Sequence, residues 1–175
     1  MSPDISIRPA GPEAADSVAA LHAASWRTTY RGILSDAYLD GAVEAERAAF
    51  WRARLAGTAA PMVLIAREGD RPLGFIAFEA EKDAEFGGLI DNFHVAAEAK
   101  GRGVGRALFD AVCGKSAAMS PGRGLYLWVI DANREARAVY ARLGGREADS
   151  RTKSGGDGTP ITVIRVVWPA PDVSA

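Results

Sequence analysis

The chain of 175 residues is long enough for one domain of ordinary size with its own core. Its apolar share of 48% and charged share of 25% are typical of a globular protein, and a net charge of −1 creates no bulk attraction to nucleic acid or an anionic membrane. No apolar run approaches the ~20 residues of a membrane span, and the single cysteine, Cys113, excludes an internal disulfide and a thiolate metal cluster. These features predict a cytoplasmic, metal-free protein.

The first sixty residues predict one short strand followed by helices. Alternating apolar residues favour a strand over 5–9, and Pro12 opens a helical pattern that continues to about Trp26. Ser35 is expected to cap a short helical turn. A further helix is expected over 43–55. The simplest interpretation of its charged residues is a solvated face, formed by Glu44, Glu46, Arg47, Arg52 and Arg54.

After Pro61 the pattern changes to short β-rich runs separated by turns. Strands are expected over 62–66, 73–78, 88–95, 125–130, 146–152 and 161–168. Helices are expected over 104–119 and 133–143. The tail after Pro169 is expected to be disordered. This order predicts one mixed α/β sheet with helices on both faces.

A glycine-rich loop, Lys100-Gly101-Arg102-Gly103-Val104-Gly105-Arg106, follows the strand that ends at Val95 and precedes a helix. A helix N-terminus presents unpaired N–H groups and about half a positive charge. Glycines let a phosphate approach such a backbone closely, and the basic side chains add charge. The loop therefore predicts an anion site, with a turn that merely begins a helix as the alternative.

Two common nucleotide motifs do not fit this segment. The dinucleotide fingerprint G-x-G-x-x-G needs a third glycine where Arg106 stands. Gly114-Lys115-Ser116 resembles the end of a P-loop, but Phe109 occupies the position of the required earlier glycine. A nucleotide-binding domain is therefore disfavoured.

The chain resembles the GNAT superfamily of N-acetyltransferases in two motifs. The run L-I-D-N-F-H-V at 89–95, followed by K-G-R-G-V-G-R-A-L at 100–108, is similar to the central motif Q/R-x-x-G-x-G/A, with Lys100 in place of Gln or Arg. The run L-W-V-I-D-A-N-R-E-A-R-A-V-Y-A-R-L-G at 127–144 is similar to the second motif, after which Gly145 replaces the usual Phe. The opening I-R-P-A and the segment A-A-S-W-R-T-T-Y-R-G-I-L-S-D-A-Y-L also look like one branch of the family.

The resemblance implies a GNAT-like fold, with a mixed, mostly antiparallel sheet of about seven strands flanked by helices on both faces. A single domain is expected over 1–175. Within it, 1–60 would form the first strand and the acceptor-side helices, and 61–170 the sheet, the coenzyme A loop and the last hairpin.

The resemblance also implies acetyl-CoA as co-substrate and no metal. The expected cofactor-binding residues are Phe93, His94, Val95, Lys100, Gly101, Arg102, Gly103, Val104, Gly105, Arg106, Asn133 and Tyr140. In the family, the backbone N–H groups of the loop bind the pyrophosphate, and the counterpart of Asn133 binds the pantetheine arm. Similar proteins bend the strand around Phe93 and Val95 away from its neighbour, so the Val95 N–H is expected to bind the thioester carbonyl.

Tyr140 is the expected catalytic acid. It lies seven residues after Asn133, so the two side chains project from nearly one side of a helix. A phenol can protonate a leaving thiolate, and the resemblance puts this tyrosine beside the coenzyme A sulfur. A core aromatic residue is the alternative interpretation.

Asp91 is the expected anchor or base for the amine. Strand alternation predicts Asp91, Phe93 and Val95 on one face, with His94 on the other. A solvated strand-end acid is an equal alternative for Asp91. His94 has a suitable pKa for a base, but a lone histidine in an apolar strand is more often a satisfied core residue. Glu79, Glu81 and Glu85 could also reach the cleft.

The acceptor side is expected to be lined by Trp26 and Tyr30, with Tyr38 as a further wall residue; ordinary helix contacts are the alternative for each. Cys113 is expected to be buried in a helix, which favours direct attack by the amine over an acyl-cysteine intermediate.

The predicted function is therefore acetyl transfer from acetyl-CoA to a primary amine of a small-molecule or peptide acceptor. The alternative is a non-catalytic acyl-CoA sensor or scaffold. A homodimer through the last hairpin or an edge strand is compatible with the sequence. Polyamine, amino acid, antibiotic, peptide N-terminus and protein lysine all remain open as acceptors.

Overall fold

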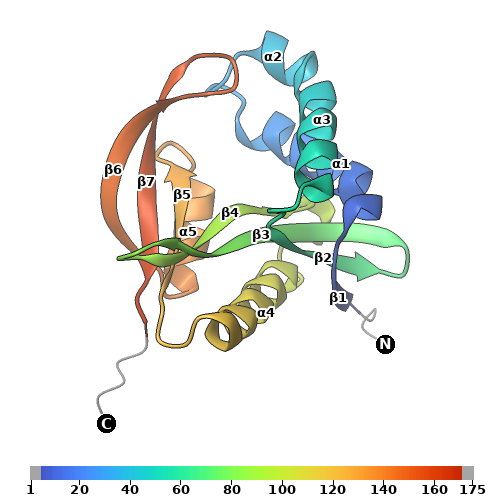
Figure 1. Ribbon diagram of the computed structural model, residues 1–175. Coiled ribbons are helices and arrows are strands. Elements are labelled where there is room, and N and C mark those ends of the chain that lie inside the picture. Colours follow the sequence, from blue (N-terminus) through green and yellow to red (C-terminus); the bar gives the residue numbers. More distant parts are fainter. Residues whose placement is uncertain (1–4, 171–175) are drawn as a thin grey trace.

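The computed structural model describes residues 5–170, so 171–175, most of the tail predicted to be disordered, lie outside the described residues. Seven strands form one sheet in the order β1-β2-β3-β4-β5-β7-β6 (Figure 1). Every neighbouring pair is antiparallel except β4 and β5. The strands are β1 Ile5–Pro9, β2 Met62–Glu68, β3 Arg71–Asp83, β4 Gly87–Val95, β5 Leu125–Ile130, β6 Arg146–Ser154 and β7 Pro160–Trp168. The predicted mixed, mostly antiparallel seven-stranded sheet is confirmed.

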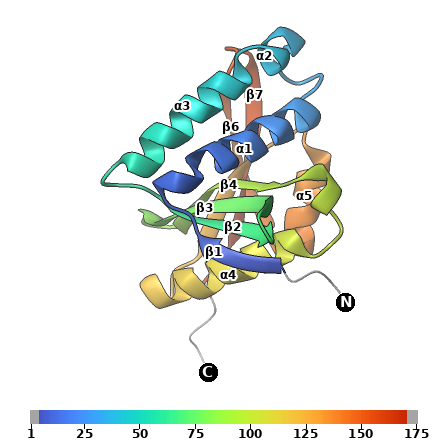
Figure 2. The same ribbon diagram turned by 90° about the vertical axis from the view of Figure 1, so that its right-hand side faces the viewer.

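Helices cover both faces of this sheet, as the sequence predicts. Helices α1 and α3 lie across one face and α4 across the other (Figure 2). The helices are α1 Ala15–Thr29, α2 Asp36–Asp40, α3 Val43–Ala56, α4 Val104–Met119 and α5 Arg134–Arg142, with 3-10 turns η1 Pro12–Ala14 and η2 Ala97–Ala99. Ser35 stands at the start of α2, but its side chain makes no capping hydrogen bond.

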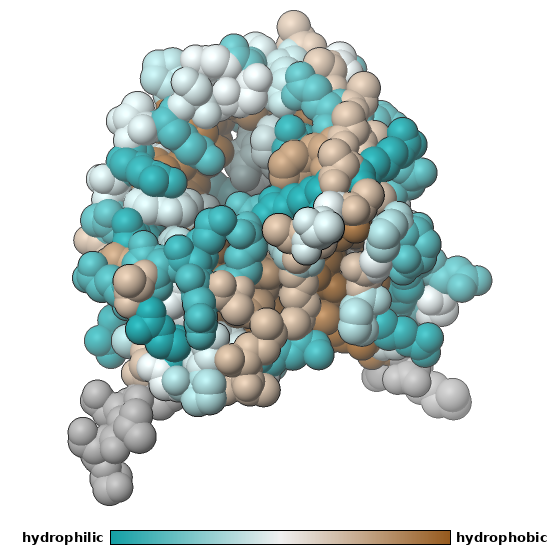
Figure 3. Space-filling model, in the orientation of Figure 1, coloured by the Kyte–Doolittle hydropathy of each residue, from teal (hydrophilic) through white to brown (hydrophobic). Residues whose placement is uncertain are grey.

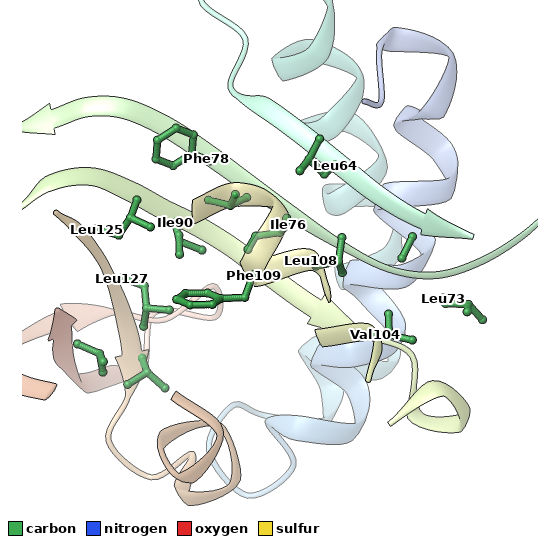
Figure 4. Packing of buried hydrophobic residues seen from close by; sticks show 14 of the residues in the cluster. Leu64, Leu73, Ile76, Phe78, Ile90, Val104, Leu108, Phe109, Leu125 and Leu127 are labelled. Atoms are coloured by element: carbon green, nitrogen blue, oxygen red, sulfur yellow. The ribbon is translucent and has the colours of Figure 1, made fainter. Parts of the chain in front are cut away.

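Strand β3 has apolar residues on both faces because helices cover both. Phe75 and Ala77 contact the cluster under α1 and α3, whereas Ile76 and Phe78 contact the cluster under α4. Figure 4 shows the α4 cluster, in which Leu108 and its neighbours meet the side chains of the sheet. Burial on two faces explains why this run lacks the apolar–polar alternation of a half-exposed strand.

Strands β4 and β5 are paired only at their beginnings. Gly88 lies opposite Leu125, and Leu89 lies opposite Tyr126; no later pair follows in the register. Beyond this point β4 continues beside β3 and β5 continues beside β7. The centre of the sheet therefore opens into a cleft bordered by two strands with unpaired edges.

The β6–β7 hairpin closes one end of this cleft. The Asp157 carboxylate accepts the backbone N–H of Ser35 at 2.7 Å and that of Thr159 at 3.0 Å. These bonds hold the pKa of Asp157 below its ordinary value. A Cβ on Gly156 would lie 2.3 Å from the Tyr38 hydroxyl oxygen, so the hairpin tip can approach α2 only without a side chain there.

Candidate active site

A cavity of about 750 Å³ lies in the opening between β4 and β5. In the space-filling view the surface is hollowed between the β6–β7 hairpin and α1 (Figure 3). We call the part formed by the glycine loop and α5 the loop side, and it is lined by Lys100, Gly101, Gly103, Val104, Gly105, Arg106, Asn133 and Tyr140. We call the part facing α1 and α3 the helix side, and it is lined by His22, Ser25, Trp26, Tyr30, Arg47, Phe50, Arg54, Asp91 and His94.

The glycine loop has the backbone shape of an anion site. Gly101 and Gly103 have φ values of +75° and +81°, a region that L side chains rarely adopt. The Ala107 N–H bonds to the Gly103 carbonyl, which is the first closed turn of α4. The backbone N–H groups of Val104, Gly105 and Arg106 therefore have no partner within the helix.

The basic side chains of the loop are already paired with acids. Lys100 Nζ donates to Glu135 at 2.8 Å, and Arg106 Nε donates to both Asp110 oxygens at 2.9 Å. Arg102 pairs with Glu68 and does not line the cavity, unlike the other residues predicted to bind the cofactor. The pairs of Lys100 and Arg106 are substantially exposed, so these two side chains can exchange their partner for another anion at small cost.

Val95 presents its N–H to the cavity rather than to the sheet. The N–H of the next residue, Ala96, bonds to the Leu73 carbonyl on the β3 side at 2.8 Å. Because N–H groups of successive strand residues point to opposite edges, the Val95 N–H points toward the opening between β4 and β5. Phe93 lines the same stretch of the cavity and stacks on Tyr140, with ring centroids 6.2 Å apart.

Asn133 and Tyr140 lie on one side of α5, as their spacing predicts, and both line the cavity. The Asn133 side-chain oxygen accepts the Ala136 N–H at 3.1 Å and caps the helix, which leaves its amide N–H₂ without a partner among residues 5–170. The Tyr140 hydroxyl makes no hydrogen bond within the same residues. Burial and the nearby Tyr30 raise the pKa of Tyr140 above its ordinary value, so this phenol is protonated at neutral pH.

Trp168 fills the space next to Gly145, the position where the resemblance leads one to expect Phe. A Cβ on Gly145 would lie 2.6 Å from Val166 Cγ1 and 2.8 Å from the Trp168 ring. The indole donates to the Leu143 carbonyl at 3.0 Å, and its ring meets the edge of Tyr140 at 6.1 Å. An indole from β7 therefore supports Tyr140 where a phenylalanine would otherwise stand.

The prediction that Asp91 shares a face with Phe93 and Val95 is wrong. The register of β4 shifts between Ile90 and Asn92, which leaves Asp91 as the extra residue of a β-bulge. Its carboxylate pairs with Arg54 of α3, on the face opposite to the α4 cluster that Phe93 and Val95 contact. The bulge reverses the alternation for the residues before it, so Ile90 rather than Asp91 shares the α4 cluster with Phe93 and Val95.

Two histidines lie together on the helix side. The His22 and His94 rings are 4.5 Å apart between centroids. Trp51 Nε1–H donates to His22 Nδ1 at 2.9 Å, so neutral His22 carries its proton on Nε2, which is buried without a partner. His94 Nδ1 lies 2.9 Å from the Ser25 hydroxyl oxygen. Burial lowers the pKa of both rings, that of His94 to about 4, with a further contribution from Arg47.

Trp26 and Tyr30 line the helix side, with ring centroids 5.5 Å apart. Burial raises the pKa of Tyr30 to about 12. Tyr38 does not line the cavity; its hydroxyl donates to Glu46 at 2.7 Å and its ring contacts the hairpin tip. Of the three aromatic residues in this segment, Trp26 and Tyr30 therefore line the cavity, whereas Tyr38 contacts the β6–β7 hairpin that closes one end of it.

The chain matches the model of the Acetyltransferase (GNAT) family over residues 19–145. It belongs to this family. The matched span contains most of α1 and all of α3, the glycine loop and α5, so it includes residues from both sides of the cavity. No curated protein matches this GNAT chain.

Solved structures of other GNAT proteins have the same fold. A GCN5-related N-acetyltransferase from Rhodopseudomonas palustris is 25% identical, with a TM-score of 0.75 and 94% of each chain covered. PaiA N-acetyltransferase from Thermoplasma acidophilum, solved with coenzyme A, is 17% identical, with a TM-score of 0.73 over 94% of this chain and 99% of that one. NAA60 from Arabidopsis thaliana, solved with acetyl-CoA, is 18% identical, with a TM-score of 0.68 over 95% and 98%.

The sequence predicts a solvated face for the charged residues of α3, but in this GNAT protein two of its arginines line the cavity. Arg47 and Arg54 have side chains only 17% and 20% exposed, and both line the cavity. Their spacing predicts that they share a side of the helix with the buried Trp51, because Arg47 lies four residues before it and Arg54 three residues after it. Glu44 and Arg52 are exposed, as expected.

Three further observations concern metal ligands, membrane-spanning helices and the single cysteine. Residues 5–170 contain no group of three or more His, Cys, Asp or Glu side chains arranged to hold a metal ion. No helix in that range is long and apolar enough to cross a membrane. Cys113 is partly buried against the α4 cluster and is not among the residues that line the cavity.

Proposed function

We propose that this GNAT protein transfers the acetyl group of acetyl-CoA to a primary amine by direct attack of the amine on the thioester. The observation that carries the proposal is one continuous cavity. It brings together the exposed N-terminus of α4, the unpaired N–H of Val95, the phenol of Tyr140 and the residues of the helix side, where we place the acceptor.

Acetyl-CoA occupies the loop side in this proposal. The pyrophosphate accepts hydrogen bonds from the N–H groups of Val104, Gly105 and Arg106, where the helix dipole also favours negative charge. The pantetheine arm runs along the unpaired edge of β4 and meets the free amide of Asn133. An edge of this kind offers the alternate N–H and C=O groups that an extended amide chain can use.

The chemical step makes one C–N bond and breaks one C–S bond. The amine nitrogen attacks the carbonyl carbon, and the Val95 N–H stabilises the negative charge that develops on the carbonyl oxygen. The carbonyl then re-forms and expels the coenzyme A thiolate, which takes the phenolic proton of Tyr140. The amine loses two protons in all: the ammonium group loses one before it attacks, and the attacking nitrogen loses a second as the C–N bond forms. One of them replaces the proton of Tyr140 through solvent, and the other is released. Cys113 has no part in this route because it lies outside the cavity.

The raised pKa of Tyr140 is compatible with the role of an acid. Burial makes the phenol a weaker acid than it is in water, but the departing thiolate is produced in the same poorly solvated place. Desolvation raises the pKa of a thiol in the same direction. The proton transfer is therefore less unfavourable than the raised phenol pKa alone would suggest.

In this proposal Asp91 and His94 have different roles toward the amine: one binds the ammonium group and the other accepts a proton. Asp91 Oδ2 is occupied by Arg54 and Asn92, whereas its Oδ1 makes no hydrogen bond within residues 5–170 and can hold an ammonium group. His94 is neutral because burial and Arg47 lower its pKa to about 4, so its ring has a free lone pair at neutral pH. The same lowered pKa makes it a weak base, which takes a proton most readily from a nitrogen that has become more acidic on attacking the thioester. We assign the anchoring of the ammonium group to Asp91 and the acceptance of that proton to His94.

The test is thiol release from acetyl-CoA in the presence of a panel of primary amines, with coenzyme A binding measured in parallel. Turnover with at least one amine class, together with acetyl-CoA binding that a Gly103→Val substitution abolishes, would support the proposal. Tight binding without turnover on any amine would favour the sensor function instead. Absence of coenzyme A binding would overturn the assignment of the loop.

A further inference from the structure

Arg47 is a cation without a hydrogen-bonded partner on the helix side of the cavity. Its guanidinium carbon lies 4.7 Å from the centroid of the Trp26 ring and 5.0 Å from that of Phe50. Its Nε is enclosed and makes no hydrogen bond. The donors that remain for a ligand are the two terminal nitrogens, which form the open edge of the guanidinium fork.

The surrounding protein does not neutralise this charge. Within residues 5–170, the one carboxylate within 4.0 Å is that of Glu46, at that limiting distance from Nη2. The same Glu46 oxygen already accepts the Tyr38 hydroxyl at 2.7 Å. The cavity's other helix-side arginine, Arg54, is paired with both Asp91 and Glu79.

Arg47 differs in this respect from the other arginines of the helical segment. Among the described residues 15–56, the remaining arginines each have a hydrogen-bonded carboxylate: Arg27, Arg31, Arg52 and Arg54. The side chains of all four are more exposed than that of Arg47. The protein therefore leaves its most buried arginine of this segment unpaired, although a cation held away from water without a counter-charge is destabilising. Such a cost is typical of a site that awaits a charged ligand.

We propose that the acceptor is an amine that also carries a carboxylate, an amino acid by chemical class, and that Arg47 binds this carboxylate. The inference rests on the acetyl transfer proposed above and narrows its acceptor. A planar carboxylate matches the two terminal nitrogens of one guanidinium, as in bidentate arginine–carboxylate pairs. A dianionic phosphate generally recruits more than one cation, and Arg54 is already occupied. A polyamine would bring further positive charge beside Arg47, which is unfavourable.

The neighbouring groups suit the rest of such a molecule. Trp26, Tyr30 and Phe50 give the helix side an aromatic wall, which accommodates an apolar side chain. The free Oδ1 of Asp91 and the neutral His94 are available to the amine, as proposed above. In one acceptor, the carboxylate would thus meet the positive charge of Arg47, and the amine would meet Asp91 and His94.

The test compares phenylalanine with phenylalaninamide, in which a neutral amide replaces the carboxylate. Each kcat/KM is referred to the concentration of unprotonated amine, because the amide also lowers the pKa of the neighbouring amine. The ratio of their kcat/KM values is measured in wild type and in Arg47→Met, which keeps an unbranched apolar side chain against Trp26 and Phe50. Arg52→Met is the matched control, because it removes the same charge from an exposed site on the same helix. Arg47→Lys keeps the charge without the fork.

Loss of a charge-assisted hydrogen bond weakens recognition by about 10- to 100-fold. The ratio of kcat/KM for phenylalanine to that for phenylalaninamide should therefore exceed about 10 in wild type and fall toward one in Arg47→Met. It should be intermediate in Arg47→Lys and the same as wild type in Arg52→Met. A wild-type ratio near one, or a ratio that survives in Arg47→Met, overturns the proposal. Circular dichroism checks that each variant is folded. If Arg47→Met does not fold, the ratio measured for Arg47→Lys is compared with that of wild type instead.

A binding measurement separates this inference from the proposed function. N-acetylphenylalanine and its amide are compared by the rise in melting temperature that each causes in wild type and Arg47→Met. If no amine is acetylated but the acid stabilises wild type more than the amide does, and Arg47→Met removes the difference, the carboxylate site stands and the transferase proposal fails. If amines are turned over but neither assay depends on the carboxylate, only the inference about Arg47 fails.

Discussion

The paired histidines predict a marked loss of stability between pH 7.5 and pH 5. The chain contains 2 histidines, and both are on the helix side of the cavity. Protonation of His22 at Nδ1 would put a second donor against the indole N–H of Trp51 and break their 2.9 Å hydrogen bond. Protonation of His94 would put a cation close to the charge of Arg47, which already lowers its pKa.

The expected magnitude follows from linkage. In the unfolded chain each histidine titrates near its ordinary pKa of about 6.5, whereas in the folded protein the pKa of His94 is about 4 and that of His22 is lowered too. A lowered folded pKa contributes stability above pH 6.5 that is lost as the pH falls, because the unfolded state then binds more protons. At pH 5 the unfolded pKa lies about 1.5 units above the pH, so each histidine costs about 2 kcal/mol and the pair about 4 kcal/mol.

Urea unfolding followed by tryptophan fluorescence measures this loss at pH 7.5 and pH 5. The ion-paired or hydrogen-bonded carboxylates with lowered pKa values titrate below this window even when unfolded, so the histidines dominate it. His94→Gln and His22→Gln should each remove about half of the pH dependence, since glutamine does not titrate. A free energy of unfolding that is the same at both pH values, or a wild-type pH dependence in the two variants, would refute the assignment of two neutral buried histidines.

Three further predictions concern single residues. Gly145→Ala should lower the unfolding free energy by about 1 to 3 kcal/mol through overpacking against Val166 and Trp168, as measured by chemical denaturation; unchanged stability would contradict it. Trp51→Phe should cost about 1 to 3 kcal/mol at pH 7.5, because His22 Nδ1 loses its donor; a smaller effect than that of an exposed substitution would argue against the bond. Cys113→Ala should keep kcat within about twofold if attack is direct, and a folded variant without turnover would indicate an acyl-cysteine.

The residues that line the loop side of the cavity could be predicted from short stretches of the sequence. The strand, glycine loop and helix that form it are consecutive in the chain, so the sequence alone could place 100–106 between the end of a strand and the beginning of a helix. Asn133 and Tyr140 lie on one helix, and a seven-residue spacing predicts one face whatever surrounds it. These predictions needed no knowledge of distant contacts.

The helix side could not be predicted in the same way because its residues meet only after folding. Arg47 and His94 come from α3 and β4, and nothing near either one in the chain indicates that they share a cavity. Asp91 shows a second limit: a period of two assumes a regular strand, and a single bulge reverses the faces of the residues before it without a sequence signal. The role of Trp168 next to Gly145 likewise depends on the pairing of β7 with β5.

The most direct measurement of the central claim is kcat for Tyr140→Phe on a turned-over amine, beside its dissociation constant for acetyl-CoA. The substitution removes only the hydroxyl, so the ring contacts with Phe93 and Trp168 remain. Loss of a catalytic acid should lower kcat by about 100-fold or more, while acetyl-CoA affinity changes by less than about threefold. An unchanged kcat would contradict the assignment of Tyr140 as the group that protonates the thiolate, and with it the mechanism proposed for this cavity.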